Sequence, residues 1–517
     1  MSGTSQERWP LVAWILIFAW APSVLAKVLC PYERCSCGEF SIYCQFKGLD
    51  QMPPLKPGTS YPQLYLYFRG NNISVVNDCE LPHNLESIDF REDSLTTIAD
   101  HAFNYSAKSL KRLTFWSTNL TSLPWALMDL SSLQYLRWDN SHVLTWNTTI
   151  LASIGASLKT LSLSELTMPN FPSHWLKLLP KLETFEMSGV AFGHLRSKPL
   201  DPPASHIKYL TITSSNLTNI PQEVVALITD LTSLNLESNS ISDLSSLKDL
   251  KAPRNVSELR MYSNHIHNIG PLFNLTGIER LEISYNRICD HKHIHHALIP
   301  NKNSLRSLDL SSNCLTQIPD LLYMSELKYL YLSSNNISTP SSGSLPTSLI
   351  NLDLDENVMT TIPESISKLP NLYSLDLSNN KIKSVADFEF PSSLDYLKIS
   401  DNDLEVIPLL QFSNNMSKLT DLDLLGNPIK TIADDAFSNL HELNNLDLSY
   451  THLVRLPSAL LTLNKLNYLS LPDTLTCSCD DMAFTTWYQN LTDLYGKCNG
   501  TNLSHMLHQL PSKCPVS

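Results

Sequence analysis

The spacing of leucine is the most regular feature of this chain. The pattern Leu-x-x-Leu-x-Leu-x-x-Asn-x-Leu returns eighteen times, at intervals of 22 to 27 residues. One clear copy consists of Leu305, Leu308, Leu310, Asn313 and Leu315. With the first leucine counted as position 1, the repeats begin near residues 63, 85, 110, 133, 158, 182, 207, 231, 256, 278, 305, 327, 349, 372, 394, 419, 443 and 466. A fixed period of this length predicts a solenoid with one repeat in each turn.

Each repeat predicts a short strand and a return segment. The leucines at positions 4 and 6 have the period-2 alternation of a strand, so both face inward and position 5 faces solvent. Return segments such as residues 98–103 and 432–437 supply apolar side chains on the opposite side. We therefore expect an α/β solenoid of about 18 repeats with a concave parallel β-sheet. No repeat can cover its own two apolar faces, so both ends of the array need caps.

Position 9 is an asparagine in ten of the repeats. These asparagines are Asn71, Asn239, Asn264, Asn286, Asn313, Asn335, Asn357, Asn380, Asn402 and Asn427. An inward amide both donates to and accepts from backbone groups, so this series predicts a structural ladder. Repeats three to seven instead carry Thr118, Ser141, Leu166, Val190 and Ser215. The interruption predicts altered curvature, and it is open whether it marks a functional site or sequence drift.

Cysteine clusters flank the repeats. Cys30, Cys35, Cys37 and Cys44 precede them, whereas Cys477, Cys479, Cys498 and Cys514 follow them. These clusters resemble the flanking modules of extracellular leucine-rich repeat proteins, the family that includes Slit, the Toll receptors, the small proteoglycans and the acid-labile subunit. The resemblance covers the whole mature chain and implies a leucine-rich repeat horseshoe with a disulfide cap at each end.

The same resemblance implies how the cap cysteines pair, which spacing alone does not decide. The implied pairs are Cys30 with Cys37, Cys35 with Cys44, Cys477 with Cys498, and Cys479 with Cys514. Trp487 stands where the C-terminal cap of the family has a core tryptophan. Residues 472–476 (PDTLT) depart from the usual Asn-Pro-Trp, so the family does not predict the geometry of the last turn.

Three further cysteines lie within the repeats. Cys289 and Cys314 fall at positions 12 and 10 of adjacent repeats, which predicts a disulfide between them. Cys79 is then left without a partner. It is either buried and inert or joined to a second chain, and we expect burial.

The N-terminal residues predict entry into the secretory pathway, which agrees with the clustered cysteines. Arg8, an apolar run over residues 11–20 and small residues at 24–26 form a signal peptide ending before Lys27. We expect a signal peptide at 1–26, an N-terminal cysteine-rich cap at 27–62, a repeat solenoid at 63–471 and a C-terminal cysteine-rich cap at 472–517.

The rest of the chain predicts no membrane insertion. It lacks the roughly 18 consecutive apolar residues of a membrane-spanning helix, and Pro515–Ser517 is not the hydrophobic tail of a glycolipid-anchor signal. The expected product is secreted and extracellular. The same sequence also fits a soluble form of a leucine-rich repeat receptor ectodomain.

Twelve Asn-x-Ser/Thr sequons agree with secretion, and they are Asn72, Asn104, Asn119, Asn147, Asn216, Asn255, Asn274, Asn336, Asn415, Asn490, Asn499 and Asn502. Four of them occupy position 10, on one lateral edge, and none falls at positions 2 to 8. The strand face is thus free of predicted glycans, either because it binds a protein or because sequons are uncommon in strands.

Candidate contacts with a partner come from the solvent-facing strand positions of the middle repeats. They are Arg260, Tyr262, Glu282, Tyr285, Asp309, Tyr329, Tyr331 and Asp353. Tyrosine and arginine are favoured anchors at protein interfaces. The alternative is ordinary surface, since a large solenoid exposes some tyrosine and charge, and aspartate is a common filler at position 5.

Composition and sequence motifs argue against several classes of partner and against an enzyme. The net charge of -13 argues against nucleic acid, heparin and anionic membranes as partners. We find no H-E-x-x-H, G-x-S-x-G, P-loop or G-x-G-x-x-G motif, so we expect neither an enzyme nor a cofactor. Six histidines between His265 and His296 fall in turns and return segments, which favours a solvated loop over a metal site.

The sequence therefore predicts a secreted glycoprotein that recognises another protein, an extracellular ligand or receptor, through its concave face. The alternative is a matrix component or a non-catalytic carrier. Solvent-facing positions vary without changing the fold, so the sequence identifies neither the partner nor the oligomeric state.

Overall fold

The computed structural model describes residues 30–56, 64–139, 146–168, 172–192, 206–228, 231–250, 254–339, 343–386, 388–408 and 416–514. The predicted signal peptide, Ser141, the sequon Asn415 and Pro515–Ser517 lie outside these residues, as does the side chain of Asn255.

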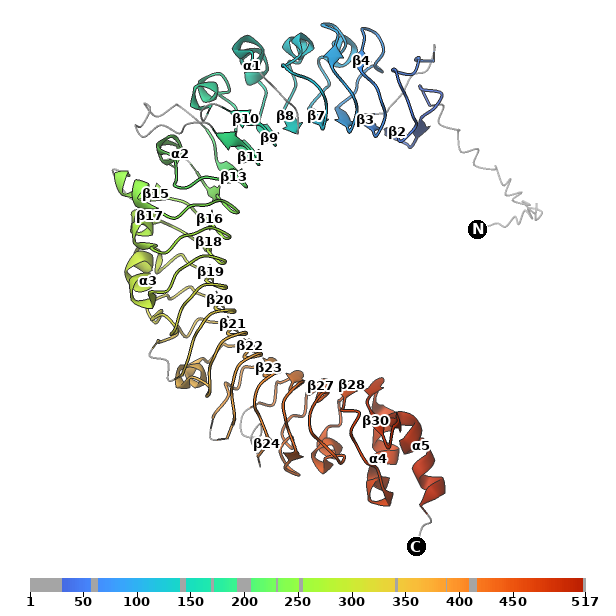
Figure 1. Ribbon diagram of the computed structural model, residues 1–517, viewed down its shortest axis with the longest axis vertical. Helices are drawn as coiled ribbons and strands as arrows, with labels where there is room; N and C mark the ends of the chain where they lie inside the picture. Colours follow the sequence, from blue (N-terminus) through green and yellow to red (C-terminus); the bar gives the residue numbers. More distant parts are fainter. Residues whose placement is uncertain are drawn as a thin grey trace, which may run out of the picture.

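Most of the described strands form one long sheet that lines the inner side of an open horseshoe (Figure 1). Its 21 strands are β1 (Ser36–Cys37), β2 (Ser41–Gln45), β3 (Tyr65–Arg69), β5 (Ser87–Arg91), β7 (Arg112–Trp116), β8 (Tyr135–Asp139), β9 (Thr160–Ser164), β11 (Thr184–Ser188), β13 (Tyr209–Thr213), β14 (Ser233–Asn235), β16 (Glu258–Arg260), β18 (Arg280–Glu282), β19 (Ser307–Asp309), β20 (Tyr329–Tyr331), β21 (Asn351–Asp353), β22 (Ser374–Asp376), β23 (Tyr396–Lys398), β25 (Asp421–Asp423), β27 (Asn445–Asp447), β28 (Tyr468–Ser470) and β29 (Asp493–Tyr495).

The strands pair in chain order. β1 is antiparallel to β2, and every later pair in this sheet is parallel. The leucines at position 4 lie opposite one another, as Leu308 does with Leu330 and Leu330 with Leu352. The strands from β3 to β28 correspond to the eighteen predicted repeats. The cysteine-rich ends add β2 and β29 to the same sheet, so both caps continue the solenoid.

The outer side of the horseshoe and its C-terminal end carry short helices and two-stranded ladders (Figure 1). The helices are α1 (Thr148–Gly155), α2 (Gln222–Leu227), α3 (His291–Leu298), α4 (Phe484–Trp487) and α5 (Leu503–Lys513). The 3-10 helices are η1 (Asn104–Ser106), η2 (Trp125–Asp129), η3 (Ser173–Lys177), η4 (Ser245–Asp249), η5 (Gly270–Asn274), η6 (Ile299–Asn301), η7 (Glu364–Lys368), η8 (Ser458–Thr462), η9 (Cys479–Ala483) and η10 (Tyr488–Asn490).

The remaining strands form five small ladders outside the main sheet. They pair β4 (Val75–Val76) with β6 (Thr97–Ile98), β10 (Thr167–Met168) with β12 (Ala191–Phe192), β15 (Arg254–Asn255) with β17 (Leu275–Thr276), β24 (Val406–Ile407) with β26 (Thr431–Ile432), and β30 (Lys497–Cys498) with β31 (Thr501–Asn502).

One continuous core runs between the sheet and the return segments. Position 4 and position 6 leucines such as Leu352 and Leu354 are at most 1 % exposed, whereas Asp353 between them is only half-buried. Burial of one such leucine contributes roughly 1.5 to 3 kcal/mol. The core is thus extended by each repeat and closed only at the ends.

The asparagines at position 9 form the predicted ladder. The Asn380 amide donates to the carbonyls of Leu354, Leu377 and Ser378 at 2.9 to 3.1 Å. Its oxygen accepts from the N–H of Met359 at 3.0 Å. Each asparagine thereby joins its own turn to the preceding repeat.

The turn just before the ladder residue has left-handed backbone. Position 8 has a φ of 50° to 70° in nearly every described repeat, and only a few of these residues are glycine. Tyr285 and Tyr450 adopt this conformation with φ of 52° and 56°. The repeat geometry therefore holds non-glycine residues where an isolated chain disfavours them.

The interrupted ladder lies among longer strands. In the long sheet, the strands from β2 to β13 have five residues, whereas those from β14 to β29 have three. Ser215 partly replaces the missing amide, because its hydroxyl donates to the Thr213 carbonyl at 2.9 Å and accepts from the Val190 N–H at 3.2 Å. The effect on curvature stays a prediction.

The caps and the middle of the array contain five disulfides. Cys30 is bonded to Cys37, Cys35 to Cys44, Cys477 to Cys498, Cys479 to Cys514, and Cys289 to Cys314. These are the pairs that the family resemblance and the repeat positions predicted.

Two expectations were wrong. Cys79 is a free cysteine, but it is exposed rather than buried, and the Tyr105 hydroxyl donates to its sulfur at 3.4 Å. The position lies in a turn with a φ of 64°, where the side chain points away from the core. Residues 291–298 form α3 rather than a loop, because Asp290 accepts the Lys292 N–H at 2.9 Å and Ile294, Ala297 and Leu298 are buried.

Candidate functional site

The concave face of the sheet holds six of the eight residues that the sequence singled out. Arg260, Glu282, Asp309, Tyr329, Tyr331 and Asp353 lie on β16, β18, β19, β20, β20 and β21. The register places Arg260 opposite Glu282, and Tyr331 between Asp309 and Asp353. The remaining two, Tyr262 and Tyr285, lie in the turns that follow β16 and β18.

The placement of Tyr262 and Tyr285 on strands was therefore wrong, because β16 ends at Arg260 and β18 ends at Glu282. At Tyr285 a φ of 52° turns the backbone out of the sheet, and the side chain is 65 % exposed. Tyr262 is half-buried, and burial together with Glu237 raises the pKa of its hydroxyl. These two tyrosines border the concave face instead of standing in its middle.

Arg260 and Glu282 belong to a square of alternating charge. Arg260 lies 2.7 Å from Glu258 and 3.3 Å from Glu282, measured between nitrogen and oxygen. Arg280 lies 3.7 Å from Glu258 and 3.9 Å from Glu282. The four charges satisfy one another, so this part of the face is close to neutral.

The aspartates at position 5 support the turns that follow their strands. Asp309 accepts the Ser311 N–H at 2.9 Å, and Asp353 accepts the Asp355 N–H at 3.0 Å. Asp376, Asp423 and Asp447 make the same bond two residues ahead. This contact gives the recurring aspartate a structural role.

Acidic side chains nevertheless accumulate on the C-terminal half of the concave face. Burial raises the pKa of Asp353 to about 6, with further contributions from Asp376, Asp355 and Asp309. Asp423 also has a raised pKa, chiefly from burial and then from Asp447. Lys398 of β23 is the basic strand residue among them and lies 3.6 Å from Asp376.

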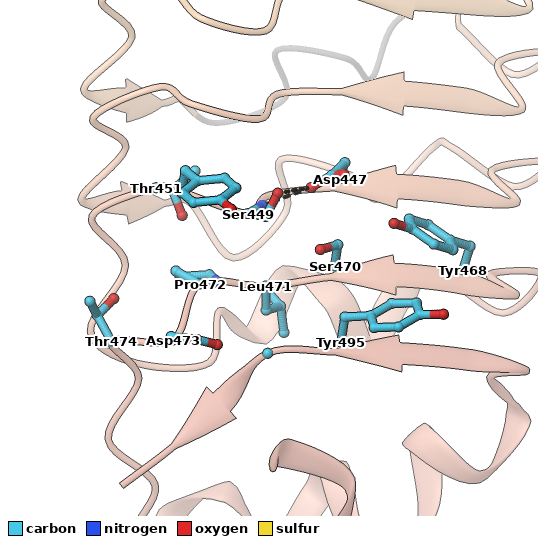
Figure 2. A pocket seen from close by; sticks show the side chains of 12 residues that line it. Asp447, Ser449, Thr451, Tyr468, Ser470, Leu471, Pro472, Asp473, Thr474 and Tyr495 are labelled. Atoms are coloured by element: carbon cyan, nitrogen blue, oxygen red, sulfur yellow. Dashed lines mark hydrogen bonds between the residues drawn. The ribbon is translucent and has the colours of Figure 1, made fainter. Parts of the chain in front are cut away.

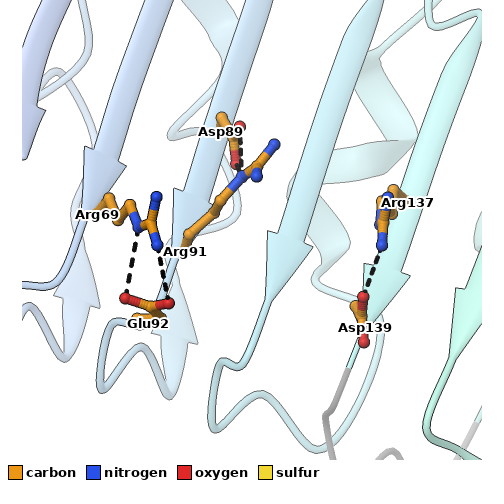
Figure 3. A network of polar contacts seen from close by, with 6 residues as sticks. All are labelled: Arg69, Asp89, Arg91, Glu92, Arg137 and Asp139. Carbon is orange, nitrogen blue, oxygen red and sulfur yellow. Dashed lines mark hydrogen bonds and ion pairs between the residues drawn. The ribbon is translucent and has the colours of Figure 1, made fainter. Parts of the chain in front are cut away.

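The N-terminal arm carries a different surface that the sequence reasoning missed (Figure 3). On β3, β5, β7 and β8, solvent-facing positions hold arginines and aromatic rings, which we call the arginine-aromatic patch: Arg69, Arg91, Arg112, Trp116, Tyr135 and Arg137. Applying the same position rule to repeats one to four would have found them. Their signal is an Arg-rich set of strand positions in an otherwise acidic chain.

Buried carboxylates orient two of these arginines (Figure 3). Arg91 donates from Nε to both oxygens of Asp89 at 2.8 and 2.7 Å. Arg137 donates from Nη2 to Asp139 at 2.8 Å. Asp89 and Asp139 are only 7 % and 5 % exposed, so each carboxylate lies beneath its arginine.

Aromatic rings lie between the guanidinium groups of the patch. Arg91 and Arg137 lie 5.1 and 5.9 Å from the ring centroid of Trp116, and they approach from the strands on either side of β7. Arg112 lies 4.1 Å from the Tyr135 ring. A cavity of about 190 Å³ next to the patch is lined by residues that include Tyr67, Arg69 and Arg91.

A larger hollow of about 590 Å³ lies where the last repeat meets the C-terminal cap (Figure 2). Tyr468 and Tyr495 project into it from adjacent strands, with ring centroids 5.6 Å apart. Pro472, Asp473 and Thr474 form one wall, and they belong to the stretch that departs from the family pattern. Asp473 is already paired with Lys497 at 2.6 Å.

Most sequons have accessible side chains. The exposed asparagines are Asn72, Asn104, Asn119, Asn216, Asn336, Asn490, Asn499 and Asn502, and the half-buried ones are Asn147 and Asn274. None of these described asparagines lies on a strand of the concave sheet. Their glycosylation stays a prediction.

The described residues form neither a metal-binding cluster nor a membrane-spanning helix. They contain no group of three or more His, Cys, Asp or Glu side chains arranged to hold a metal ion. Within the same described ranges, no helix has the length and apolar character needed to span a bilayer.

Comparison with known proteins finds leucine-rich repeats over residues 77–187 and 304–475. A model described as Leucine rich repeat matches residues 325–382, 347–404, 392–453 and 417–475. A model of a BspA type Leucine rich repeat region matches residues 77–187, and a Leucine Rich Repeat model matches residues 304–324.

Two relatives match in sequence over part of their length. Leucine-rich repeats and immunoglobulin-like domains protein 3 of Homo sapiens is 34 % identical over 158 residues, which are 30 % of this chain and 13 % of that protein. Lumican of Mus musculus is 27 % identical over 266 residues, or 49 % of this chain and 69 % of lumican. The first of these relatives is thus matched over a small share of its length.

A solved structure shows the same fold. The crystal structure of the mouse RP105/MD-1 complex contains a chain that superposes with a TM-score of 0.61 at 19 % identity, covering 88 % of this chain and 78 % of that one. The repeat models, the long and mainly parallel sheet and the disulfides at both ends agree with one another. The chain belongs to the leucine-rich repeat proteins, and its cysteine caps fit the extracellular members of that family.

Proposed function

We propose that this chain is a secreted, non-catalytic glycoprotein that recognises another protein through the concave face of its solenoid. The proposal includes cleavage of a signal peptide at residues 1–26, caps at 27–62 and 472–517, and a solenoid at 63–471. The observation that carries it is the combination of exposed tyrosine and arginine side chains with a strand face on which no described sequon lies.

The middle of the face is the proposed contact region. Tyr329 is 41 % exposed and Tyr331 is half-buried, and both lie on β20 near the centre of the horseshoe (Figure 1). Tyrosine supplies a large, rigid contact surface at a low cost in conformational entropy. Asp309 and Asp353 on the neighbouring strands provide acceptors beside Tyr331.

A glycan placed on the concave face tests the proposal. Tyr331→Asn creates the sequon Asn-Leu-Ser with Leu332 and Ser333, so a sugar would cover the centre of the sheet. Partners are captured from the extracellular fluid of the source organism with the glycosylated wild-type chain and with this variant. We expect the wild type to retain a saturable partner that the glycosylated variant loses.

Two controls separate steric blocking from other effects. The variant Tyr331→Asn with Ser333→Ala has no sequon, so it reports the loss of the tyrosine alone. Trp125→Ala removes a 51 % exposed aromatic side chain from the return side and should leave capture unchanged. Equal capture by the glycan-bearing variant and the wild type would contradict recognition by the concave face.

A further inference from the structure

We infer that the arginine-aromatic patch on the N-terminal arm binds an acidic peptide segment of a partner protein. The inference rests on the proposed function in one respect, because it takes the concave face as the surface that meets a ligand. It adds a second site on that face, and it specifies the chemistry of what binds there.

The guanidinium groups of the patch have donors that the described residues leave unused. A guanidinium has five N–H donors. Among the described residues, Arg91 donates only from Nε, and Arg112 contacts the Tyr135 ring without any carboxylate partner. These donors match the bidentate geometry of a carboxylate, which a lysine could not provide.

The arginines are held in place before any ligand arrives. Asp89 and Asp139 fix Arg91 and Arg137 from the sheet side, and the Trp116 ring lies between the two guanidinium groups. Their side chains are 36 % and 37 % exposed, so their outer surfaces reach solvent. A preorganised group loses less side-chain entropy on binding than a mobile one.

Charge elsewhere on the molecule favours this end of the face for an acidic ligand. The chain has a net charge of -13, and the C-terminal strands carry a row of aspartates. Arg260 and Arg280, in the middle, each lie within 4 Å of two glutamates. In the patch, Arg69, Arg91 and Arg137 each pair with one carboxylate, that of Glu92, Asp89 and Asp139 respectively. Arg112 is the fourth arginine and has only the Tyr135 ring contact among the described residues, so these side chains keep a net positive charge. An acidic segment is therefore repelled from the C-terminal half and attracted to the N-terminal arm.

The aromatic rings define the rest of the partner segment. Tyr43 on β2 and Tyr67 on β3 stack with their centroids 5.3 Å apart, next to Arg69 at the N-terminal edge of the patch. Tyr43 is 40 % exposed, and Phe46 beside Arg69 is 65 % exposed. Tyrosine, tryptophan and arginine together are the residues that dominate binding energy in protein interfaces. We therefore expect glutamate or aspartate alternating with aromatic residues in the ligand.

The test uses the full secreted chain and a fluorescent peptide of alternating glutamate and tyrosine, with the lysine-tyrosine peptide as its charge-reversed counterpart. We expect saturable binding of the acidic peptide that weakens with salt, and no comparable binding of the basic one. In Arg91→Gln with Arg112→Gln, the dissociation constant should rise by about tenfold or more. Arg280→Gln with Arg306→Gln removes the same charge outside the patch and should change it less than about twofold.

A second variant and a competing ligand make the outcome of this test decisive. If the double variant loses its folded circular-dichroism spectrum, Arg112→Gln alone is used, since Arg112 makes only the ring contact. Absence of saturable binding, equal binding of the basic peptide, or an unchanged dissociation constant in the variant would overturn the inference. So would tighter binding of a heparin fragment at the same arginines, which would assign the patch to a sulfated glycan.

The experiments can refute the arginine-aromatic patch and the central contact region independently of each other. Loss of a natural partner in the Tyr331→Asn variant, without any binding of the acidic peptide, would refute the patch and retain recognition by the face. Acidic-peptide binding that depends on Arg91 and Arg112, with partner capture unaffected by the glycan at position 331, would retain the patch and refute the central contact region.

Discussion

At the scale of single residues, the ladder position shows how one atom changes the energetics of a repeat. Asparagine donates to three carbonyls and accepts a backbone N–H, as Asn380 does. Repeat two has Asp93 there, which is 4 % exposed. An ionised carboxylate cannot donate, so Asp93 cannot make the bonds to carbonyls that the asparagine amide makes.

Burial raises the pKa of Asp93 from 3.8 to about 6, although the N–H groups of Ile73 and Asn71 lower it. The folded state therefore binds a proton more tightly than the unfolded state. The local free energy of unfolding should increase as the pH falls from about 6 toward 3.8. Above pH 6 it should stay constant at its lower value, because Asp93 is then ionised in both states. We predict that Asp93→Asn stabilises this region by about 2 to 3 kcal/mol at pH 7 and abolishes that pH dependence.

Amide hydrogen exchange of β3, β5 and β7, measured at pH values below and above 6, checks this prediction. The control is Asp100→Asn, since Asp100 lies in the same repeat at the surface of the return segment. Equal protection from hydrogen exchange in wild type and Asp93→Asn at neutral pH would show that the buried carboxylate does not lower the local free energy of unfolding.

At the scale of elements, the caps cover the apolar ends of the repeat array. β29 pairs with β28 and extends the sheet, while α5 places Leu503, Met506, Leu507 and Leu510 over the end of the core. The disulfide between Cys479 and Cys514 links η9 to the end of α5. Without these elements, the last repeat would expose its apolar face to water.

We predict that Cys479→Ser with Cys514→Ser lowers the stability of the C-terminal cap by about 2 to 4 kcal/mol, because the link closes a 35-residue separation. Limited proteolysis followed by mass spectrometry should show earlier cleavage near α5. Cleavage of the N-terminal cap should not change, and faster cleavage at both ends would instead indicate that the caps are coupled through the array.

At the scale of the whole molecule, the contacts are local even though the sheet is continuous. Each strand pairs only with its neighbours, and the two arms of the horseshoe do not meet (Figure 1). Stability in such an array is close to a sum of repeat and nearest-neighbour contributions. A defect in one repeat should therefore loosen its neighbours and leave the distant arm unchanged.

Asn380→Ala tests this locality. It leaves backbone carbonyls without donors in a buried turn, so we expect a local loss on the order of 1 to 3 kcal/mol. Hydrogen exchange should accelerate in β21, β22 and β23, with no change in β3 to β8. Asn336→Ala, at an exposed edge position, is the matched control and should alter neither region. Acceleration along the entire sheet would contradict local cooperativity.

The candidate site could be predicted in part. The position rule placed Arg260, Glu282, Asp309, Tyr329, Tyr331 and Asp353 on the strands of the concave sheet, because alternation depends only on local geometry. It misplaced Tyr262 and Tyr285, since β16 and β18 have three residues each and end before these positions, and the backbone at Tyr285 is left-handed. It also did not indicate that Arg260 and Glu282 neutralise each other across β16 and β18.

The sequence by itself determined the number of repeats, the parallel sheet, its inward leucines and the asparagine ladder. These follow from a period that every turn repeats, so the same apolar and polar positions recur in each copy. Only the tertiary structure decided which side chains from different repeats meet. Trp116 lies between Arg91 and Arg137, Asp93 is buried and Cys79 is exposed because residues distant in the sequence become neighbours when the turns stack.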